Sequence, residues 1–147
     1  MSIKERLQQD LKESLKKKDT IRLNTIRSII NAIKNKEIDL RKEVTEEEIY
    51  AILNSLAKQR RESIEQYEKG GRQDLVDQEK RELEIILEYL PEQLSEKEIE
   101  KIVKETIEEV GASSMKDLGK VMKAVMPKVK GRADGKKVNE IVRSLLS

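Results

Sequence analysis

The chain has 147 residues, the length of one compact domain or two small ones, and its 31 basic and 29 acidic side chains leave a net charge of only +2. It contains no histidine and no cysteine, which excludes disulfides, zinc sites built from thiolate or imidazole, and cysteine or serine–histidine nucleophile pairs. The longest apolar run is five residues, 49–53, and charges begin at Lys4, so we expect no signal peptide or membrane span and a cytoplasmic location. We also expect no metal and no cofactor.

Apolar residues recur at intervals of three and four along nearly the whole chain, which predicts an all-α, multihelical protein. Ser2 and Glu5 have the spacing of a capping box and open a first helix. A second helix is predicted to start near Asp19. The predicted buried stripes are Leu7, Leu11 and Leu15 in the first helix, and Ile26, Ile29, Ile30 and Ile33 in the second.

Two further helices complete the N-terminal region. Thr45 and Glu48 predict another capping box, at the start of a long helix. Gly70 and Gly71 end this helix, because glycine accepts the left-handed backbone of a helix terminus, and the next helix runs until Pro91. The predicted buried residues are Ile49, Ile52, Leu53, Leu56 and Ile64 in the long helix, and Leu83, Ile86, Leu87 and Leu90 in its successor.

Three helices are predicted after the proline. Their predicted caps are Ser95 with Glu98, Ser114 with Asp117, and Asp134, and the first two helices end at Gly111 and before Pro127. Their predicted stripes are Ile99, Ile102, Val103 and Val110; Leu118, Val121, Met122 and Val125; and Val138, Ile141, Val142 and Leu145. We therefore expect a longer N-terminal helical domain, residues 1–93, and a small C-terminal three-helix domain, residues 94–147.

Positive charge is concentrated near the C-terminus. Residues 1–94 carry 19 basic and 20 acidic side chains, whereas residues 113–147 carry nine basic and three acidic ones, a net charge of +6. A basic surface on an otherwise near-neutral molecule is the electrostatic pattern of a nucleic-acid contact. A solvated face with a small stability penalty is the alternative interpretation.

The placement of these cations does not serve helix stability. Lys116, Lys120 and Lys123 share one helix face, where like charges repel. Lys136 and Lys137 lie in the first turn of the last helix, where the helix dipole disfavours cations. A polyanion bound to both clusters would make these two unfavourable electrostatic contributions favourable.

Three glycines accompany the cations. Residues 131–137 lack the spacing and the preceding strand of a Walker phosphate loop, which excludes that kind of nucleotide site. Gly131 and Gly135 allow a phosphate backbone to come close, or they belong to an ordinary turn before a helix cap. Gly119 lies inside a predicted helix at a cost of about 1 kcal/mol, which close packing of another helix explains first and close approach of RNA second.

The three aromatic residues, Tyr50, Tyr67 and Tyr89, lie outside the basic segment, so bases have no stacking platform there and any RNA is recognised by shape and backbone. Several arginines elsewhere are predicted to form helix-surface ion pairs rather than a second RNA contact. They are Arg22, Arg27, Arg60, Arg61 and Arg72.

One long motif resembles a known family. The run DLGKVMKAVMPK at residues 117–128, followed by GRADGK at residues 131–136, resembles the signature of the YqeY family. Earlier pieces fit the same family, so the resemblance spans the chain. They are Arg22 with Thr25, Ile26 and Arg27, Tyr67 with Gly71 and Arg72, Glu79 with Glu82, and Leu90 with Pro91.

The resemblance implies a cytoplasmic, two-part helical protein whose C-terminal domain is similar to the tail of the B subunit of the tRNA-dependent amidotransferase. That tail contacts tRNA, while the catalytic parts lie in other domains and subunits. The resemblance makes a set of basic residues candidates for tRNA contact, and the charge pattern adds Lys116. Gly119, Gly131 and Gly135 are candidates for positions where the RNA backbone comes close to the protein. The basic candidates are Lys116, Lys120, Lys123, Lys128, Lys130, Arg132, Lys136 and Lys137.

Three functions remain open at this point. The first is a tRNA-binding accessory module without catalytic residues of its own. The second is a helical adaptor that docks an amidotransferase or another tRNA-handling protein through its basic face. The third, implied by the family alone, is carbon–nitrogen ligase activity with glutamine as amido donor.

Overall fold

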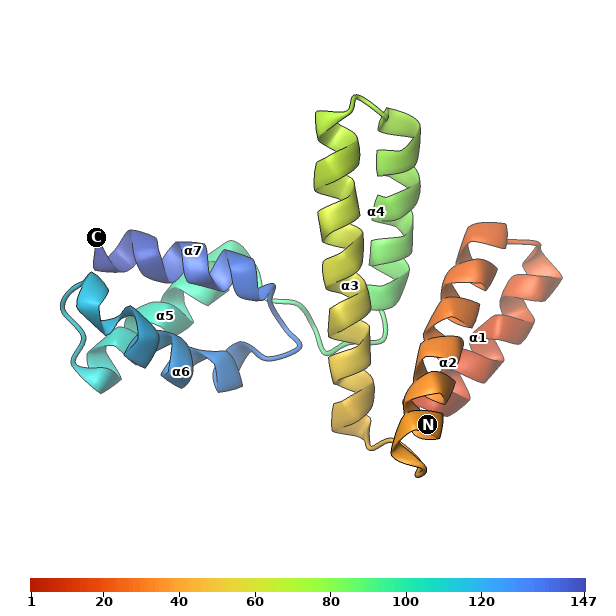
Figure 1. Ribbon diagram of the computed structural model, residues 1–147, viewed down its shortest axis with the longest axis horizontal. Helices are drawn as coiled ribbons and strands as arrows, with labels where there is room; N and C mark the ends of the chain where they lie inside the picture. The colour runs from red at the N-terminus through yellow and green to blue at the C-terminus, as the bar shows by residue number, and fades with distance from the viewer. The chain divides into compact units, whose positions relative to one another are not determined.

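The computed structural model describes residues 1–147, and in it seven α-helices and one 3₁₀ turn follow one another without a strand (Figure 1). The prediction of an all-α, multihelical protein is therefore confirmed. The chain divides into two compact units, Met1–Leu90 and Pro91–Ser147, each with its own hydrophobic core.

The N-terminal unit consists of two helical hairpins. Its helices are α1 (Ile3–Lys17), α2 (Thr20–Leu40), α3 (Glu46–Lys69) and α4 (Gln73–Leu87). Figure 1 shows α1 beside α2 and α3 beside α4, and α2 contacts all three of the other helices. The hairpins therefore share one core, in which α2 is the central element.

Side-chain caps set where α1, α2 and α3 begin, whereas α4 begins after Arg72 without one, and the capping box predicted at Ser2 forms only one of its two hydrogen bonds. Ser2 Oγ accepts a hydrogen bond from the N–H of Glu5, and Asp19 caps α2 through the N–H of Arg22. Thr45 starts α3 with a reciprocal capping box that includes Glu48.

Most of the predicted inward residues of the N-terminal unit are buried or packed against its core, with one correction. Leu15 was expected to continue the stripe of α1, but half of its surface, 51%, is exposed. It lies in the last turn of α1, next to the bend at Lys18, where the chain takes a left-handed conformation and turns into α2. Tyr89 fills the core beside α1, where its hydroxyl donates to Asp10 and its ring lies 4.9 Å below the guanidinium of Arg6.

The C-terminal unit is a bundle of three helices, α5 (Glu96–Val110), α6 (Leu118–Val129) and α7 (Gly135–Leu146), and α6 follows the 3₁₀ turn η1 (Met115–Asp117). Each of the three helices contacts the other two, and α7 runs antiparallel to α6 (Figure 1). The fully buried centre of this unit is formed by valines. They are Val103, Val121, Val125, Val129, Val138 and Val142.

The structure corrects two details of this unit. α6 does not end before Pro127 but continues to Val129, because a proline in the last turn forfeits only one intrahelical hydrogen bond. In α7 the stripe ends at Leu146, which is 7% exposed, rather than at Leu145, which is 37% exposed.

The segment that leads into α5 is fastened to the loop between α6 and α7. The Leu94 N–H donates to the Arg132 carbonyl oxygen at 2.8 Å. The side-chain amide of Gln93 donates to the carbonyl oxygens of Pro91 and Gly131, at 2.8 and 2.9 Å. These bonds fix the α6–α7 loop from within its own unit.

Candidate nucleic-acid interface

The outward face of α6 carries lysines without acidic neighbours on the same helix. Val121 and Val125 point into the core, and the 3.6-residue period of the helix places Lys120 and Lys123 on the opposite side. Both lysines are exposed and form no ion pair. Because α6 contains no aspartate or glutamate between Leu118 and Val129, no residue of this helix neutralises the face.

Lys116 was predicted to share a helix face with Lys120 and Lys123, but α6 begins only at Leu118. It lies in the 3₁₀ turn before α6, is exposed and has no acidic partner. The predicted capping box at Ser114 is replaced by a tighter arrangement in which the Ser114 hydroxyl accepts from the Lys116 N–H at 3.3 Å. The Asp117 carboxylate accepts from the N–H of Ser113 at 2.9 Å, so this acid is engaged by the loop that precedes it.

Lys128 is held on another side of the helix. Its ammonium group lies 2.7 Å from Glu109 Oε2 and donates to the hydroxyl of Thr106 at 3.0 Å. Thr106 is fully buried on α5 and donates its own proton to the Ile102 carbonyl oxygen. Lys128 therefore fastens α6 to α5, and its charge is paired within the unit.

Lys137 and Arg132 also have partners within the unit. Lys137 Nζ lies 3.4 Å from Glu96 Oε1, at the start of α5. Arg132 Nε donates to the Glu92 carbonyl oxygen at 3.4 Å. Both side chains face the segment around the N-terminus of α5, whereas Lys120 and Lys123 face solvent.

The remaining two basic candidates flank the α6–α7 loop. Lys130 is exposed directly after α6 and has no acidic partner. Lys136 is exposed in the first turn of α7, where its main-chain N–H donates to the capping carboxylate of Asp134 at 3.3 Å. This cap is the predicted one.

The three glycines have different environments. Gly131 is buried with a φ of +76°, and its carbonyl oxygen accepts the Gln93 amide. Gly135 packs under α6, because a Cβ there meets the terminal methyl of Met126 at 3.7 Å. At Gly119 a Cβ meets nothing within 4 Å, so close packing, the first explanation for this glycine, does not account for it.

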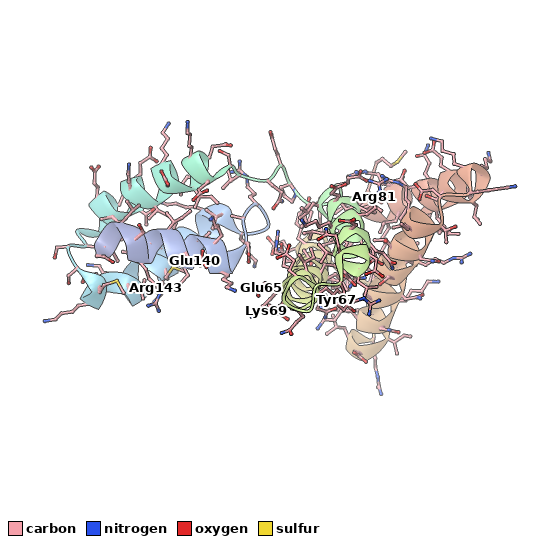
Figure 2. The ribbon with its side chains drawn as sticks, turned by 90° about the horizontal axis from the view of Figure 1, so that it is seen from above. Glu65, Tyr67, Lys69, Arg81, Glu140 and Arg143 are labelled. Atoms are coloured by element: carbon pink, nitrogen blue, oxygen red, sulfur yellow. The ribbon has the colours of Figure 1, made fainter.

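Sequence reasoning left Arg143 out of the candidate set. This exposed arginine lies on α7 near Glu140, as Figure 2 shows, and its Nε donates to Asn139 Oδ1 at 2.7 Å. Because α7 runs antiparallel to α6, Arg143 lies at the end of the bundle where α6 begins. Its seven-residue spacing from Lys136, which places both on one helix face, is the signal that identifies it.

Arginines of the N-terminal unit form ion pairs. Arg22 binds Glu88 with two hydrogen bonds, of 2.7 and 3.1 Å, and this carboxylate raises the pKa of the guanidinium. Arg72 forms a similar pair with Asp74 at the tip of the α3–α4 hairpin. These two arginines are engaged in ion pairs, as predicted, whereas Arg27 is exposed and does not form the predicted pair. No group of three or more acidic side chains in the structure is arranged to hold a metal ion, and none of its helices has the length and apolarity to cross a bilayer.

Comparison with known proteins gives one family. The family model described as Yqey-like protein matches residues 4–146. Curated relatives carry the name altered inheritance of mitochondria protein 41, mitochondrial. The protein from Lachancea thermotolerans is 44% identical over 85 residues, which are 57% of this chain and 46% of that protein. The protein from Pyrenophora tritici-repentis is 33% identical over 144 residues, 93% of this chain and 79% of that protein.

A third relative, from Vanderwaltozyma polyspora, is 36% identical over 120 residues, 76% of this chain and 64% of that protein. The chain thus spans only about half of the Lachancea thermotolerans protein and about two thirds of the Vanderwaltozyma polyspora protein. All three are named mitochondrial proteins, which contradicts the expected cytoplasmic location. That expectation rested on the lack of an apolar run, and mitochondrial targeting peptides are amphipathic rather than continuously apolar.

Proposed function

The chain belongs to the YqeY family, and from this premise we propose that it is an accessory RNA-binding protein that holds the sugar–phosphate backbone of tRNA on its C-terminal unit. The observation that carries the proposal is the outward face of α6 with Lys116, Lys120 and Lys123. All three lysines are exposed and have no acidic partner, and Lys120 and Lys123 share one face of α6, while Lys116 lies in the turn directly before it.

The electrostatics of this face favour an anionic ligand. Lysines three and four residues apart repel one another and weaken a helix slightly. Carboxylates on the same helix would relieve that repulsion, and α6 has none. Phosphates lying along the face supply the missing negative charge and release counterions, so binding gains both electrostatic energy and entropy.

Two observations support recognition of the backbone rather than the bases. None of the three tyrosines lies in the C-terminal unit, so this unit offers no aromatic surface on which a base can stack. Lysine is a point charge that contacts phosphate without reading sequence. The choice of tRNA among RNAs rests on the resemblance of the basic motif to the amidotransferase tail.

The proposal assigns no reaction to the chain. The lysines of α6 supply charge and position, and no carboxylate or hydroxyl on that face is arranged to transfer a proton or an acyl group. Ligase activity with glutamine as amido donor is tested directly, by assaying the purified chain for glutamine-dependent amide formation on aminoacyl-tRNA. Turnover by the isolated chain would contradict the proposal.

The decisive experiment compares two double variants of the full chain. K120Q/K123Q neutralises the α6 face, and K97Q/K101Q removes two lysines from α5, where they alternate with Glu100, Glu105 and Glu108. Fluorescence anisotropy with labelled tRNA measures affinity between about 50 and about 200 mM salt.

The wild-type affinity is expected to fall with salt at a logarithmic slope of about −3, and the α6 variant to lose about two units of that slope. The α5 variant is expected to keep the wild-type slope. Absence of tRNA binding at low salt, or equal loss in both variants, overturns the proposal. Binding that instead requires a co-purifying acidic protein identifies the chain as an adaptor.

A further inference from the structure

Gly119 is a glycine that its own fold does not require. Its backbone φ is not positive, so the left-handed conformation that favours glycine is absent. An added Cβ meets nothing within 4 Å, so no neighbouring helix needs the space. Glycine lowers the stability of a helix relative to alanine, and in this position the fold gains nothing in return.

The surroundings of Gly119 are cationic. Lys123 follows it by four residues, a spacing that places two side chains beside each other on a helix, and Lys116 lies three residues before it in the 3₁₀ turn. Lys120 is its immediate neighbour in sequence. The three unpaired lysines therefore surround a spot on α6 where the helix backbone is bare and exposed.

An exposed backbone between cations suits an extended anionic ligand that is too wide to pass over a side chain. The helix rises 1.5 Å per residue, so Lys116 and Lys123 are separated by about 10 Å along the axis, with Gly119 between them. A sugar–phosphate strand crossing this interval touches the helix at its middle while its phosphates reach lysines on either side. A side chain at position 119 would hold the strand away and lengthen every lysine–phosphate contact.

Resting on the proposed function, we propose that Gly119 is the point at which one RNA strand lies in van der Waals contact with α6, so that Lys116, Lys120 and Lys123 bind phosphates of that strand. The glycine is then a positioning residue for the contact. Its cost in helix stability is retained because the missing side chain admits the strand.

The test uses two substitutions of the full chain, with labelled tRNA as the probe. Gly119→Ala is expected to raise the melting temperature by about 2 °C, because alanine favours the helix and clashes with nothing. The same substitution is expected to weaken tRNA binding by about three- to tenfold. A higher melting temperature together with weaker tRNA binding distinguishes the loss of an RNA contact from a folding defect.

Gly119→Lys distinguishes contact from charge. If the face acts only through its net charge, an added lysine tightens tRNA binding. Direct contact at Gly119 predicts weaker binding in spite of the extra positive charge. Gly70→Ala in the N-terminal unit is the matched control, because its backbone is right-handed and its Cβ has ordinary contacts of 3.6 Å or more, and it is expected to leave affinity unchanged.

Unchanged affinity in Gly119→Ala, or tighter binding in Gly119→Lys, overturns the contact at Gly119. The proposed function survives that result if K120Q/K123Q still weakens tRNA binding. Absence of tRNA binding by the wild-type chain overturns both proposals, and binding of an acidic protein in place of tRNA does the same.

Discussion

The ammonium group of Lys128 lies 2.7 Å from Glu109 Oε2, which joins α6 to α5 across 19 residues of sequence. Five residues earlier on the same helix, Lys123 is exposed and has no such partner. Two lysines of one motif therefore do different work, one holding the bundle together and the other facing solvent.

This contrast predicts different effects of the two substitutions. Lys128→Ala removes a partly exposed ion pair and a hydrogen bond to buried Thr106, so it is expected to lower the free energy of unfolding by about 1 kcal/mol. Lys123→Ala is expected to leave stability within about 0.5 kcal/mol but to weaken tRNA binding. Urea unfolding and tRNA anisotropy measure the two effects. A larger loss of tRNA affinity in Lys128→Ala than in Lys123→Ala would contradict this division of roles.

The hydrogen bond from Tyr89 to Asp10 predicts a second effect. Tyr89 is 2% exposed, and burial together with the Asp10 carboxylate raises the pKa of its phenol. Tyr89→Phe keeps the ring beneath Arg6 but leaves the Asp10 carboxylate without this donor, so we expect a loss of about 1–2 kcal/mol at neutral pH. Urea unfolding at pH 7 measures this loss.

The same tyrosine sets the sign of an alkaline effect. Since the folded state holds the phenol neutral, the unfolded chain ionises first, and stability falls as pH rises above about 10. This part of the loss is expected to disappear in Tyr89→Phe. Thermal unfolding between neutral and alkaline pH checks it, and parallel profiles for the two proteins would show that the phenol does not titrate as described.

A shared arginine in the α3–α4 hairpin gives a third prediction. Arg60 Nε lies 3.6 Å from one oxygen of Glu79 and 3.6 Å from one of Glu82, and neither Arg60 Nε nor Glu79 Oε2 forms a hydrogen bond. Burial and the neighbouring Glu82 raise the pKa of Glu79. The folded state therefore takes up this proton before the unfolded chain does, and this group's contribution to stability is lost as pH rises through its raised pKa.

Glu79→Gln removes that titration. The variant is expected to be at least as stable as the wild type at pH 7. It is also expected to lack the part of the increase in the free energy of unfolding on acidification that protonation of Glu79 supplies. The difference between wild-type and variant stability, measured by urea unfolding from pH 7 to pH 4, isolates this group from carboxylates such as Glu37 and Glu98, whose pKa values are lowered. A constant difference across this range would contradict the raised pKa of Glu79.

Much of the fold could be predicted because its signals are local. A helix cap such as Thr45 with Glu48, or Ser95 with Glu98, joins groups three residues apart, so the sequence alone locates the start of the helix. The errors lie at helix ends. The exposure of Leu15 and Leu145 and the length of α6 past Pro127 were predicted wrongly. These features depend on how far the core reaches, and the periodicity of the sequence does not reveal that.

The candidate site could be predicted only as a set of charges. The charge pattern and the family resemblance together gave eight basic residues, and nothing in their spacing distinguishes Lys120 from Lys128 or Lys137. The acids that bind Lys128 and Lys137 lie on α5, 19 and 41 residues away along the chain. Such partners become neighbours only when the helices pack.

The amino-acid sequence by itself determined that this protein is helical, where most of its helices begin, and that its positive charge gathers near the C-terminus, because capping, periodicity and composition act within a few residues. Only the tertiary structure decided which of those cations are held by carboxylates, that Gly119 is open to solvent, and that Gly131 is buried. Ion pairing and burial depend on distances between helices, and those distances are fixed by how the buried valines of α5, α6 and α7 pack.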